Sequence, residues 1–589
     1  MNSEVQKLLQ EVEGKPKVID KSSTLNQCST KIYFASRTHS QLNQFTDQLR
    51  LTSFPSSFEG IEEKIKYLPM SSRKQLCIHE KVSKIKDTQE LNDACLQLQK
   101  DKEEGCPFYP NPSSEHDTEL MNNFRDLSFS DIHDIEDLHD IGKHYNICPY
   151  YSSRKSVDIA EIISLPYQLL LQKSTREVLG LSLKDSIVII DEAHNLLDTI
   201  SDLNSSSISF KDMLKARNAL KSYMKKFSSK MNGGNRINIS LLYKLITYLA
   251  KYMKKQTDAK KNKPGTEISA IDIFEGTTGD LLNIHSLEKY LSKSKIAFKL
   301  ESYMEKLETD EQATNINNKQ SFKNKKPSST PVLFKIKSFL YCLSNPSKSG
   351  KLFFDKSSDG DTVMTYLLLD PSEAFKDIVE QSKCVILAGG TMEPVSDFTN
   401  LLFPYLSSEK INHFNCGHII PDSNLNVYPI RSFNGCEFEF TFDKRNGTNL
   451  INNLGQSLIK ILMSVPFGVV VFFPSYKYLD QVVDCWKKAG LLPQIEKLKK
   501  VFTESKTDSA ESVLQNYSSL IETERKGAVL FSVVGGKMSE GINFSNDLAR
   551  AVIMVGLPFP NVFSGDLIAK RKYIETTTLE NGECGSCYS

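Results

Sequence analysis

Short apolar runs that end in small or polar residues recur along the chain and predict the strands of parallel sheets. In the first 400 residues they are KIYFA at 31–35, IVII at 187–190 and VILA at 385–388. After residue 440 they are GVVVFFPSY, GAVLFSVVGG and RAVIMVGLPFPN. Stretches with helical spacing separate these runs. Strands that alternate with helices are typical of the α/β class, whose ligands bind at the carboxyl ends of the strands.

Two insertions interrupt this alternation. Residues 60–155 contain four cysteines and few strand signals, whereas residues 200–370 show helical spacing and many basic side chains. Inside the second insertion, NINNKQSFKNKKPSSTP at 315–331 is polar, rich in lysine and interrupted by proline. Such a composition cannot bury enough apolar surface to fold, so we predict a disordered linker there.

Composition narrows the class of protein. The 589 residues are 39% hydrophobic and 25% charged, which is typical of globular domains and excludes a small disulfide-stapled scaffold. No run reaches the roughly 18 apolar residues of a membrane span, and the polar N-terminus has no signal-peptide pattern. We therefore expect an intracellular protein without a membrane partner, whose twelve cysteines are thiols or metal ligands.

Positive charge is concentrated in one segment, although the net charge of the chain is only +1. Between Lys211 and Lys263 there are fifteen Lys or Arg and two acidic residues, with five Phe or Tyr interleaved among them. Basic and aromatic side chains together favour nucleic-acid binding, with Lys225 and Lys226 as candidate contacts. The alternative is a solvated basic helix face whose aromatic side chains pack on the other side.

The strand at 187–190 is followed by Asp191, Glu192, Ala193 and His194. A carboxylate at a strand end can hold the Mg²⁺ ion that bridges nucleotide phosphates, and a second carboxylate can orient and deprotonate the attacking water. We assign the first role to Asp191 and the second to Glu192. The alternative interpretation is an acidic pair that caps the following helix.

Eight motifs, in order from about residue 30 to about residue 570, surround and include this acidic pair. They are Ser36–Leu42 (SRTHSQL), Cys106–Tyr109 (CPFY), Cys148–Tyr151 (CPYY), Leu165–Gln168 (LPYQ), Asp191–His194 (DEAH), Gly389–Met392 (GGTM), Phe472–Tyr476 (FFPSY) and Val533–Phe544 (VVGGKMSEGINF). With these motifs the sequence resembles the XPD-like, iron–sulfur branch of superfamily 2 DNA helicases. Within that branch it is similar to the ChlR-type DEAH-box helicases, which are linked to sister-chromatid cohesion.

The resemblance implies an α/β fold with two RecA-like parallel-sheet motor domains, both incomplete, an iron–sulfur insertion and a helical arch insertion. The implied domains are an N-terminal remnant at 1–30, motor domain 1 at 31–59, 156–200 and 371–400, the iron–sulfur domain at 60–155, the arch at 201–370, motor domain 2 at 401–575 and a divergent tail at 576–589. The implied function is ATP-dependent unwinding of DNA by 5′ to 3′ translocation on a single strand, in nuclear DNA repair and chromosome cohesion. The implied partners are single-stranded and forked DNA, ATP, and cohesion or replication-fork proteins.

The resemblance also implies roles for residues within these motifs. The residues implied to be catalytic are Asp191, Glu192 and His194. Those implied to contact the DNA strand are Ser36, Arg37, Thr38 and Ser40, joined by Arg73. Those implied to couple nucleotide and DNA are Gly389, Gly390, Thr391, Gly536, Ser539, Glu540, Gly541 and Asn543. Any one of these glycines, taken alone, would be interpreted as part of a simple turn.

Four cysteines of the first insertion fall where this family places the ligands of a [4Fe–4S] cluster: Cys77, Cys95, Cys106 and Cys148. Four thiolates suit such a cluster, which would stabilise a small domain with little core. The spacing of the four cysteines contains no CxxC pair, and taken alone it favours buried thiols without a metal. If the thiolates do bind a metal, zinc is the alternative to the cluster. Arg73 matches a family arginine beside the cluster and would compensate its negative charge. Cys384 precedes a predicted strand and is expected in the core, and the CxxC at 584–587 is not expected to bind metal.

Two parts of an ATPase of this family are not found. No G-x-x-x-x-G-K-[ST] phosphate loop occurs in the 589 residues, and the chain leaves the family pattern after about Tyr573 without a QxxGRxxR-type arginine helix. Both elements act on the transferred phosphoryl group, so the sequence predicts a truncated chain with negligible ATP hydrolysis by itself. Two alternatives to the helicase interpretation therefore stay open: a catalytically inactive iron–sulfur DNA-binding product of a helicase gene, and a non-functional product.

Overall fold

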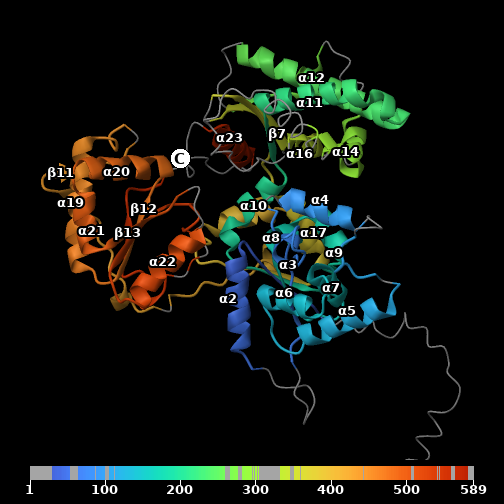
Figure 1. Cartoon of the computed structure of the whole chain (residues 1–589). Coiled ribbons are helices and arrows are strands. Elements are labelled where there is room, and N and C mark those ends of the chain that lie inside the picture. The colour runs from blue at the N-terminus through green and yellow to red at the C-terminus, as the bar shows by residue number, and fades with distance from the viewer. Residues whose placement is uncertain are drawn as a thin grey trace, which may run out of the picture. The chain divides into compact units, whose positions relative to one another are not determined.

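A computed structural model represents the chain (Figure 1). It describes residues 30–53, 64–85, 88–99, 105–111, 113–258, 265–275, 282–294, 296–297, 299–300, 303, 332–344, 350–357, 360–418, 420–441, 443–505, 510–539, 542, 544–558 and 564–580. The linker predicted at 315–331 and the CxxC at 584–587 lie outside this set. None of the described helices is both long and apolar enough to cross a membrane. The chain divides into two compact units, Met1–Leu203 with Pro371–Leu402 and Asn204–Asp370 with Phe403–Ser589.

The first unit is built on a parallel five-stranded sheet in the order β2-β3-β1-β4-β9. Its strands are β1 (Ile32–Ser36), β2 (Tyr67–Pro69), β3 (Ile162–Pro166), β4 (Ile187–Ile190) and β9 (Cys384–Leu387). Ala35 in β1 lies opposite both Leu165 in β3 and Ile190 in β4, and all three residues are fully buried. The apolar runs predicted in this half of the sequence are therefore strands of one sheet, and those of β1 and β4 are buried at its centre.

Helices connect these strands and form the cysteine-bearing insertion. Those next to the sheet are α2 (His39–Arg50), α8 (Tyr167–Leu171), α9 (Lys173–Leu179), α10 (Leu196–Leu203), α17 (Ser372–Gln381) and α18 (Val395–Leu402). Those of the insertion are α3 (Arg73–Leu76), α4 (Thr88–Leu98), α5 (Glu115–Ser128), α6 (Ile135–His144) and α7 (Pro149–Ser156). Arg50 at the end of α2 pairs with Asp137 of α6 at 2.6 Å and donates from Nε to the Ile132 carbonyl at 2.9 Å. The insertion is thus fixed to the helix that follows β1.

Strand β9 lies at one edge of the sheet and pairs with β4. Cys384 is exposed, and Ile386 is 44% exposed. The expectation that Cys384 belongs to the core is therefore wrong. The apolar run correctly indicated a strand, but among the described residues no further strand pairs with its outer side, so alternate side chains stay in solvent.

Residues 204–368 of the second unit combine helices with a small antiparallel sheet. The helices are α11 (Phe210–Phe227), α12 (Gly233–Asp258), α13 (Ala270–Phe274), α14 (Ile284–Lys293) and α16 (Val332–Ser344). The strands, in the order β5-β8-β7-β6, are β5 (Ser206–Ser209), β6 (Thr266–Glu267), β7 (Gly350–Lys356) and β8 (Thr362–Leu368). Leu220, Leu245, Phe339 and Met364 are fully buried between the helices and the sheet. The helical spacing predicted the helices but not this sheet, whose strands are far apart in the sequence.

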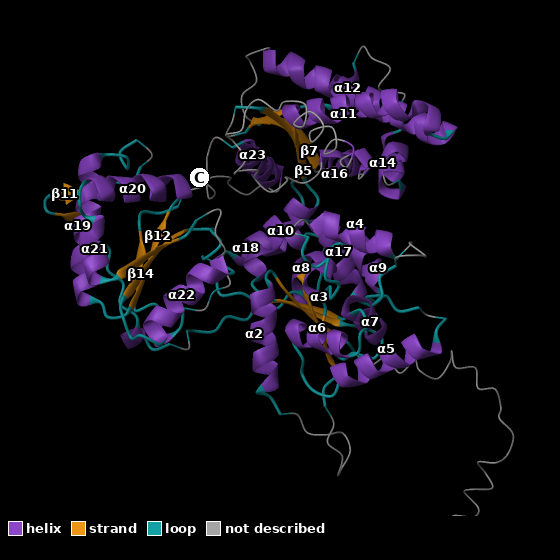
Figure 2. Ribbon diagram, viewed as in Figure 1, coloured by secondary structure: helices purple, strands orange, loops and turns teal. Residues whose placement is uncertain are grey.

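A second parallel sheet follows in the same unit, in the order β13-β14-β12-β15. Its strands are β12 (Gly468–Phe473), β13 (Lys500–Thr503), β14 (Ala528–Val533) and β15 (Ala551–Met554), preceded by the short pair β10 (Ser432–Phe433) and β11 (Cys436–Glu437). Helices α19 (Thr448–Ser464), α20 (Tyr476–Lys488) and α21 (Leu492–Leu498) cover one face, and α22 (Ala510–Glu522) covers the other (Figure 2). Val469 packs in the same cluster as Trp486, whereas Val470 packs with Tyr517 of α22. Both faces are thus buried at the central strands β12 and β14, as their continuous apolar runs predicted. At the edge strand β15, Val552 and Met554 are exposed.

The last described helix, α23 (Gly565–Glu580), packs against β7. The Gly565 amide donates to the Asp355 carboxylate at 3.0 Å, and Ala569 and Tyr573 contact the cluster around Phe353. Most of this helix falls in the range predicted for motor domain 2, yet it contacts the range predicted for the arch. The predicted domain boundaries stay predictions.

Candidate functional site

The polar motifs of the first unit meet at one edge of the five-stranded sheet. β1 ends at Ser36, β3 at Pro166, β4 at Ile190 and β9 at Leu387. Because these strands are parallel, their carboxyl ends lie at the same edge, where open α/β sheets bind ligands. The SRTHSQL, LPYQ, DEAH and GGTM motifs begin at or next to these ends, and we call their common location the DEAH edge.

Backbone contacts hold the DEAH and GGTM motifs side by side. The Ala193 amide donates to the Ala388 carbonyl at 2.8 Å. A Cβ atom at Gly389 would lie 2.9 Å from the sulfur of the methionine in GGTM and 3.5 Å from the Ala193 nitrogen. An added side chain would therefore displace the flexible methionine side chain, while its contact with the Ala193 backbone would be an ordinary one. Gly390 and Thr391 are exposed beside it.

The two carboxylates of the DEAH motif differ in their surroundings. Glu192 has φ +50° and ψ 43°, a left-handed conformation that is strained for a residue other than glycine. Its Oε2 lies 3.1 Å from His194 Nδ1. Within the described part of the chain, the Asp191 carboxylate accepts no hydrogen bond and forms no ion pair. One carboxylate is thus oriented by a neighbour, and the other is open to a ligand.

A line of hydrogen bonds continues from His194 to the SRTHSQL motif. Asn195 Nδ2 lies 2.8 Å from His194 Nε2, and Asn195 Oδ1 accepts from Arg37 at 3.0 Å. Because the amide nitrogen is a donor, His194 Nε2 accepts, and Nδ1 carries the proton that faces Glu192. Asn195 was not predicted as a site residue, and its position directly after DEAH was the one signal for it.

Tyr167 is a second residue that was not predicted as part of the site. It follows β3, and its hydroxyl donates to the backbone carbonyl of Asp191. Burial, and then the negative charges of Asp191 and Glu192, raise the pKa of Tyr167, so the phenol stays a neutral donor. Its place in the LPYQ motif, at the end of a strand, was the available signal.

The hydroxyl groups of the SRTHSQL motif are partly used within the motif itself. Ser36 is fully buried, and its Oγ donates to Gln41 Oε1 at 2.7 Å. Thr38 caps α2, because its Oγ1 accepts from the Gln41 amide. Arg37 and Ser40 are exposed. Among the four predicted contacts, these two are placed to reach a ligand, while Ser36 and Thr38 shape the loop.

The four cysteines predicted to bind a cluster come from separate parts of the helical insertion. Cys77 follows α3, Cys95 lies in α4, Cys106 lies between α4 and α5, and Cys148 precedes α7. All four are partly exposed free thiols. Burial, with a contribution from the neighbouring Cys95 and Cys106, raises the pKa of Cys148 to about 12. Within the described residues, no three His, Cys, Asp or Glu side chains come together as ligands of one metal ion.

Hydrogen-bond donors are directed at each of these sulfur atoms. For Cys77, Cys106 and Cys148, the backbone amide two residues further along the chain donates to the sulfur. The sulfur of Cys95 accepts from Gln99 Nε2 at 3.4 Å. Such bonds favour the thiolate, which is the form that binds metals.

Two arginines stand beside the thiols. The guanidinium of Arg73 lies 4.5 Å from the ring centre of Tyr150 and donates to the Tyr151 hydroxyl at 3.0 Å. That of Arg154 lies 3.9 Å from the same Tyr150 ring. The Nε atoms of both arginines are buried without a hydrogen-bond partner, and neither side chain forms an ion pair with a described acid. The site thus holds positive charge next to four thiols.

The second parallel sheet also carries its polar motif at the carboxyl ends of its strands. β14 ends at Val533 and leads into Gly535, which has φ +69°. Ser539 Oγ donates to the Gly536 carbonyl at 2.9 Å. The other predicted residues of this loop lie outside the described part of the chain: Glu540, Gly541 and Asn543.

Glu504 is a residue at this edge that was missed in the sequence. It directly follows β13 and is only 3% exposed. Its carboxylate accepts from the Tyr476 hydroxyl and from Ser532 Oγ, both at 2.6 Å, and from the Val533 amide at 3.0 Å. Burial raises the pKa of Glu504, but these hydrogen bonds outweigh burial and hold the pKa below its usual value. The signal was a carboxylate directly after a short strand, KVFTE.

The basic segment lies on α11 and α12. Its exposed cations are Lys211, Lys215, Lys221, Lys225, Lys226, Lys230, Arg236, Lys244, Lys251, Lys254 and Lys255. Tyr223, Tyr243 and Tyr252 pack against the core of this region. Lys226 Nζ lies 5.0 Å from the ring centre of Tyr303. The lysines are thus accessible while most of the aromatic rings serve packing, and DNA contact by Lys225 and Lys226 stays a prediction.

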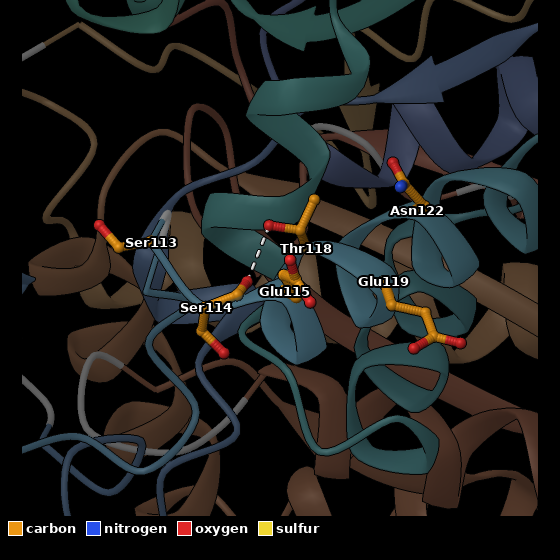
Figure 3. A pocket seen from close by; sticks show the side chains of 6 residues that line it. All are labelled: Ser113, Ser114, Glu115, Thr118, Glu119 and Asn122. Carbon is orange, nitrogen blue, oxygen red and sulfur yellow. Dashed lines mark hydrogen bonds between the residues drawn. The ribbon is translucent and has the colours of Figure 1, made fainter.

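A surface hollow at the start of α5 holds none of the predicted site residues. In it the Thr118 hydroxyl donates to the Ser114 carbonyl at 2.9 Å (Figure 3). Its lining consists of Ser113, Ser114, Glu115, Thr118, Glu119 and Asn122. These are polar and acidic side chains at a helix start, and we assign no function to them.

Comparisons with known proteins agree with the order of the motifs. The family model DEAD_2 matches residues 34–213, and the model Helicase C-terminal domain matches residues 458–587. The ATP-dependent DNA helicases CHL1 of Debaryomyces hansenii and Candida albicans are 51% and 52% identical to the chain, covering 99% of it and 69% and 68% of their own lengths. That of Saccharomyces cerevisiae is 46% identical, over 99% of the chain and 67% of its own length.

A solved XPD helicase structure has a TM-score of 0.53 with 18% identity, and the match covers 94% of this chain and 81% of that one. This likeness confirms the predicted α/β class with parallel helicase sheets. The matches also confirm the predicted resemblance, and they favour the helicase interpretation over the inactive product. The chain belongs to the CHL1 family of ATP-dependent DNA helicases.

Proposed function

We propose that this chain acts as an ATP-dependent DNA helicase that binds forked DNA and moves along one strand, in the 5′ to 3′ direction implied by the family resemblance. The DEAH edge is the observation that supports the proposal most strongly. There an open carboxylate, an oriented carboxylate and an exposed arginine lie at the ends of adjacent parallel strands. Phosphoryl transfer is promoted almost entirely by such positioning and charge.

Glu192 is suited to accept a proton from the attacking water. His194 Nδ1 donates to its carboxylate, so the charged form is held in one orientation. The strained backbone of Glu192 is kept in place by the hydrogen bond from Ala193 to Ala388. Asp191 offers open carboxylate oxygens, the ligand type that Mg²⁺ prefers, and would hold that ion. Bound there, Mg²⁺ would neutralise charge on the β- and γ-phosphates.

We propose that Gly389, Gly390 and Thr391 couple the nucleotide to the DNA. The hydrogen bond from Ala193 to Ala388 joins the DEAH motif directly to the chain that enters GGTM. A displacement of the DEAH loop on nucleotide binding would therefore move GGTM as well.

For DNA we propose contacts to Arg37, Ser40 and the exposed lysines of α11 and α12. Lysine and arginine contacts to phosphates are independent of sequence, as a translocating enzyme requires. Arg73 packs on Tyr150 among the thiols, which supports charge compensation at the cysteines more than contact with DNA.

The test compares the chain alone with the chain joined to the flanking segments of the Debaryomyces hansenii relative, of which it covers 69%. ATP hydrolysis with and without single-stranded DNA, and strand separation of a forked duplex, are measured for both. We expect the chain alone to hydrolyse negligible ATP. In the extended protein, Asp191→Asn should abolish both activities, whereas Asp202→Asn, at an exposed aspartate of α10, should leave them unchanged. Activity that survives Asp191→Asn, or wild-type protein inactive in both forms, would contradict the proposal.

We further propose that the four cysteines hold a [4Fe–4S] cluster. The donors aimed at the sulfurs and the two arginines suit thiolates around a negatively charged group. Zinc, which four thiolates can also bind, is the alternative metal. Bound to these residues, the cluster would cross-link α3, α4 and α7.

Iron content and visible absorption of protein purified without oxygen test this proposal. Cys77→Ser should lower the iron content and expose residues 64–156 to proteolysis, whereas Cys436→Ser, at a partly exposed thiol outside the insertion, should change neither. Reconstituted protein with stoichiometric zinc and no iron would overturn the cluster.

From the family resemblance we also propose that the protein works in the nucleus, in DNA repair and sister-chromatid cohesion, with cohesion or replication-fork proteins. Cells that lack it should separate sister chromatids prematurely, and a tagged copy should locate to the nucleus. Normal cohesion in such cells, or a tagged copy outside the nucleus, would contradict this assignment.

A further inference from the structure

A buried carboxylate lies beneath the loop that follows β14. Glu504 comes directly after β13, and its amide donates to the Phe531 carbonyl at 2.8 Å, which keeps it in register beside β14. Only 3% of the residue is exposed. Burying a charge is strongly unfavourable unless polar groups form hydrogen bonds with it. The buried carboxylate of Glu504 is therefore tolerated only because hydrogen-bond donors surround it.

The described donors to this carboxylate are neutral groups from the start of α20, the end of β14 and the loop after β14. Tyr476, after β12, donates to Oε1, while Ser532 and the Val533 amide donate to Oε2. The Lys537 amide donates as well. Hydrogen bonds to an ionised acceptor are about twice as strong as neutral ones. They hold the pKa of Glu504 below its usual value although burial raises it, so the carboxylate is ionised.

The loop closes tightly around this charge. A Cβ atom at Gly536 would lie 2.6 Å from Glu504 Oε1, a distance at which a side chain does not fit without displacing the carboxylate. Gly535 precedes it with φ +69°, the left-handed region that favours glycine. The turn is completed by Ser539 Oγ, which donates to the Gly536 carbonyl at 2.9 Å. Glu504 therefore determines the path of the loop backbone.

We propose that Glu504 is a positioning residue that holds the Val533–Ser539 loop in the conformation that couples nucleotide and DNA. This inference rests on the proposed function, because the coupling role of the loop is itself part of that proposal. Glutamine at this position would have one acceptor oxygen and an amino group that faces a donor, so it cannot satisfy all the donors. Alanine would leave every one of them without its acceptor.

Hydrogen exchange of the loop amides tests the positioning independently of activity. In Glu504→Gln, the Val533 and Lys537 amides should exchange about 10-fold faster, because charge-assisted bonds are replaced by weaker ones or lost. Glu504→Ala should exchange faster still. Glu524→Gln is the matched control, since that exposed acid pairs with Lys526 at the surface. Unchanged exchange in both Glu504 variants would overturn the inference.

The ratio of DNA-stimulated to unstimulated ATP hydrolysis tests the functional part. We expect this ratio to fall at least about fivefold in Glu504→Gln, because the loss of one charge-assisted hydrogen bond corresponds to about that factor or more. In the control Glu524→Gln the ratio should stay unchanged. Faster loop exchange with an unchanged ratio would reduce Glu504 to a structural residue and overturn the proposal. If wild-type protein hydrolyses no ATP, the proposed function fails, and the exchange experiment still decides the positioning.

Discussion

Asn195 connects the exposed arginine of the SRTHSQL motif with the histidine that orients Glu192. Its carbonyl accepts from Arg37 at 3.0 Å, and its amino group lies 2.8 Å from His194 Nε2. The Arg37 contact fixes which way the amide faces, and the amide in turn sets the tautomer of His194. Asn195→Ala should therefore leave Glu192 in place but less well oriented, lowering turnover without removing the base.

The magnitude follows from the hydrogen bond between Asn195 and His194, which the substitution removes. A neutral hydrogen bond contributes about 0.5–1.5 kcal/mol, and about 1.36 kcal/mol corresponds to a tenfold change in rate. Asn195→Ala should thus lower kcat about 2- to 13-fold. Loss of a general base lowers the rate about 10²- to 10⁴-fold, so the two effects are distinguishable.

The assay is steady-state ATP hydrolysis with saturating single-stranded DNA, from which kcat and KM for ATP are obtained separately. We expect kcat to fall and KM to stay within about twofold, because Asn195 orients the base and does not hold the phosphates. Asn122→Ala, at an exposed asparagine of α5, is the matched control. An unchanged kcat in Asn195→Ala, or a loss that appears only in KM, would refute the orientation of Glu192 through His194.

Two further predictions concern DNA binding and stability. Lys225→Glu combined with Lys226→Glu should weaken binding to single-stranded DNA of any sequence. The slope of the logarithm of the binding constant against the logarithm of the salt concentration should fall by about 1.4, because two phosphate contacts are lost. An unchanged slope would indicate that these lysines lie on a solvated face and do not contact DNA. Gly455→Ala would place a Cβ atom 2.6 Å from Trp486 Nε1, which donates to the Ile451 carbonyl at 2.8 Å. We expect about 1–3 kcal/mol of destabilisation, although alanine favours a helix by about 1 kcal/mol. An unchanged urea midpoint would speak against this packing.

The sequence predicted the parallel sheets well because their central strands are buried on both faces. Runs such as IVII at 187–190 are apolar throughout, and parallel strands covered on both sides require this. The polar residues after such runs lie at the carboxyl ends of parallel strands, the edge at which α/β sheets bind ligands. The apolar runs did not predict how deeply each residue is buried. Cys384 begins a similar run but is exposed, because it lies on an edge strand.

Features that depend on distant pairing could not be predicted. Strand β8 pairs with β5 from more than a hundred residues earlier, and β7 pairs with β6 from more than eighty residues earlier. No local pattern encodes that register. Glu504 is satisfied by donors such as Tyr476 and Ser532, each 28 residues away. A buried carboxylate looks like a surface one in the sequence, because its partners come from distant elements, here α20 and β14. Tyr167 and Asn195 stood inside or next to predicted motifs, yet their contacts appeared only with the fold.

The central claim is that the DEAH edge hydrolyses ATP with Glu192 as the base, and Glu192→Gln tests it most directly. Turnover with single-stranded DNA and nucleotide affinity are measured on the same preparation, in the form of the protein that is active as wild type. We predict that kcat falls about 10²- to 10⁴-fold while nucleotide binding is retained, because Asp191 and the backbone around Ala193 are unchanged. Turnover equal to wild type in Glu192→Gln would contradict the account.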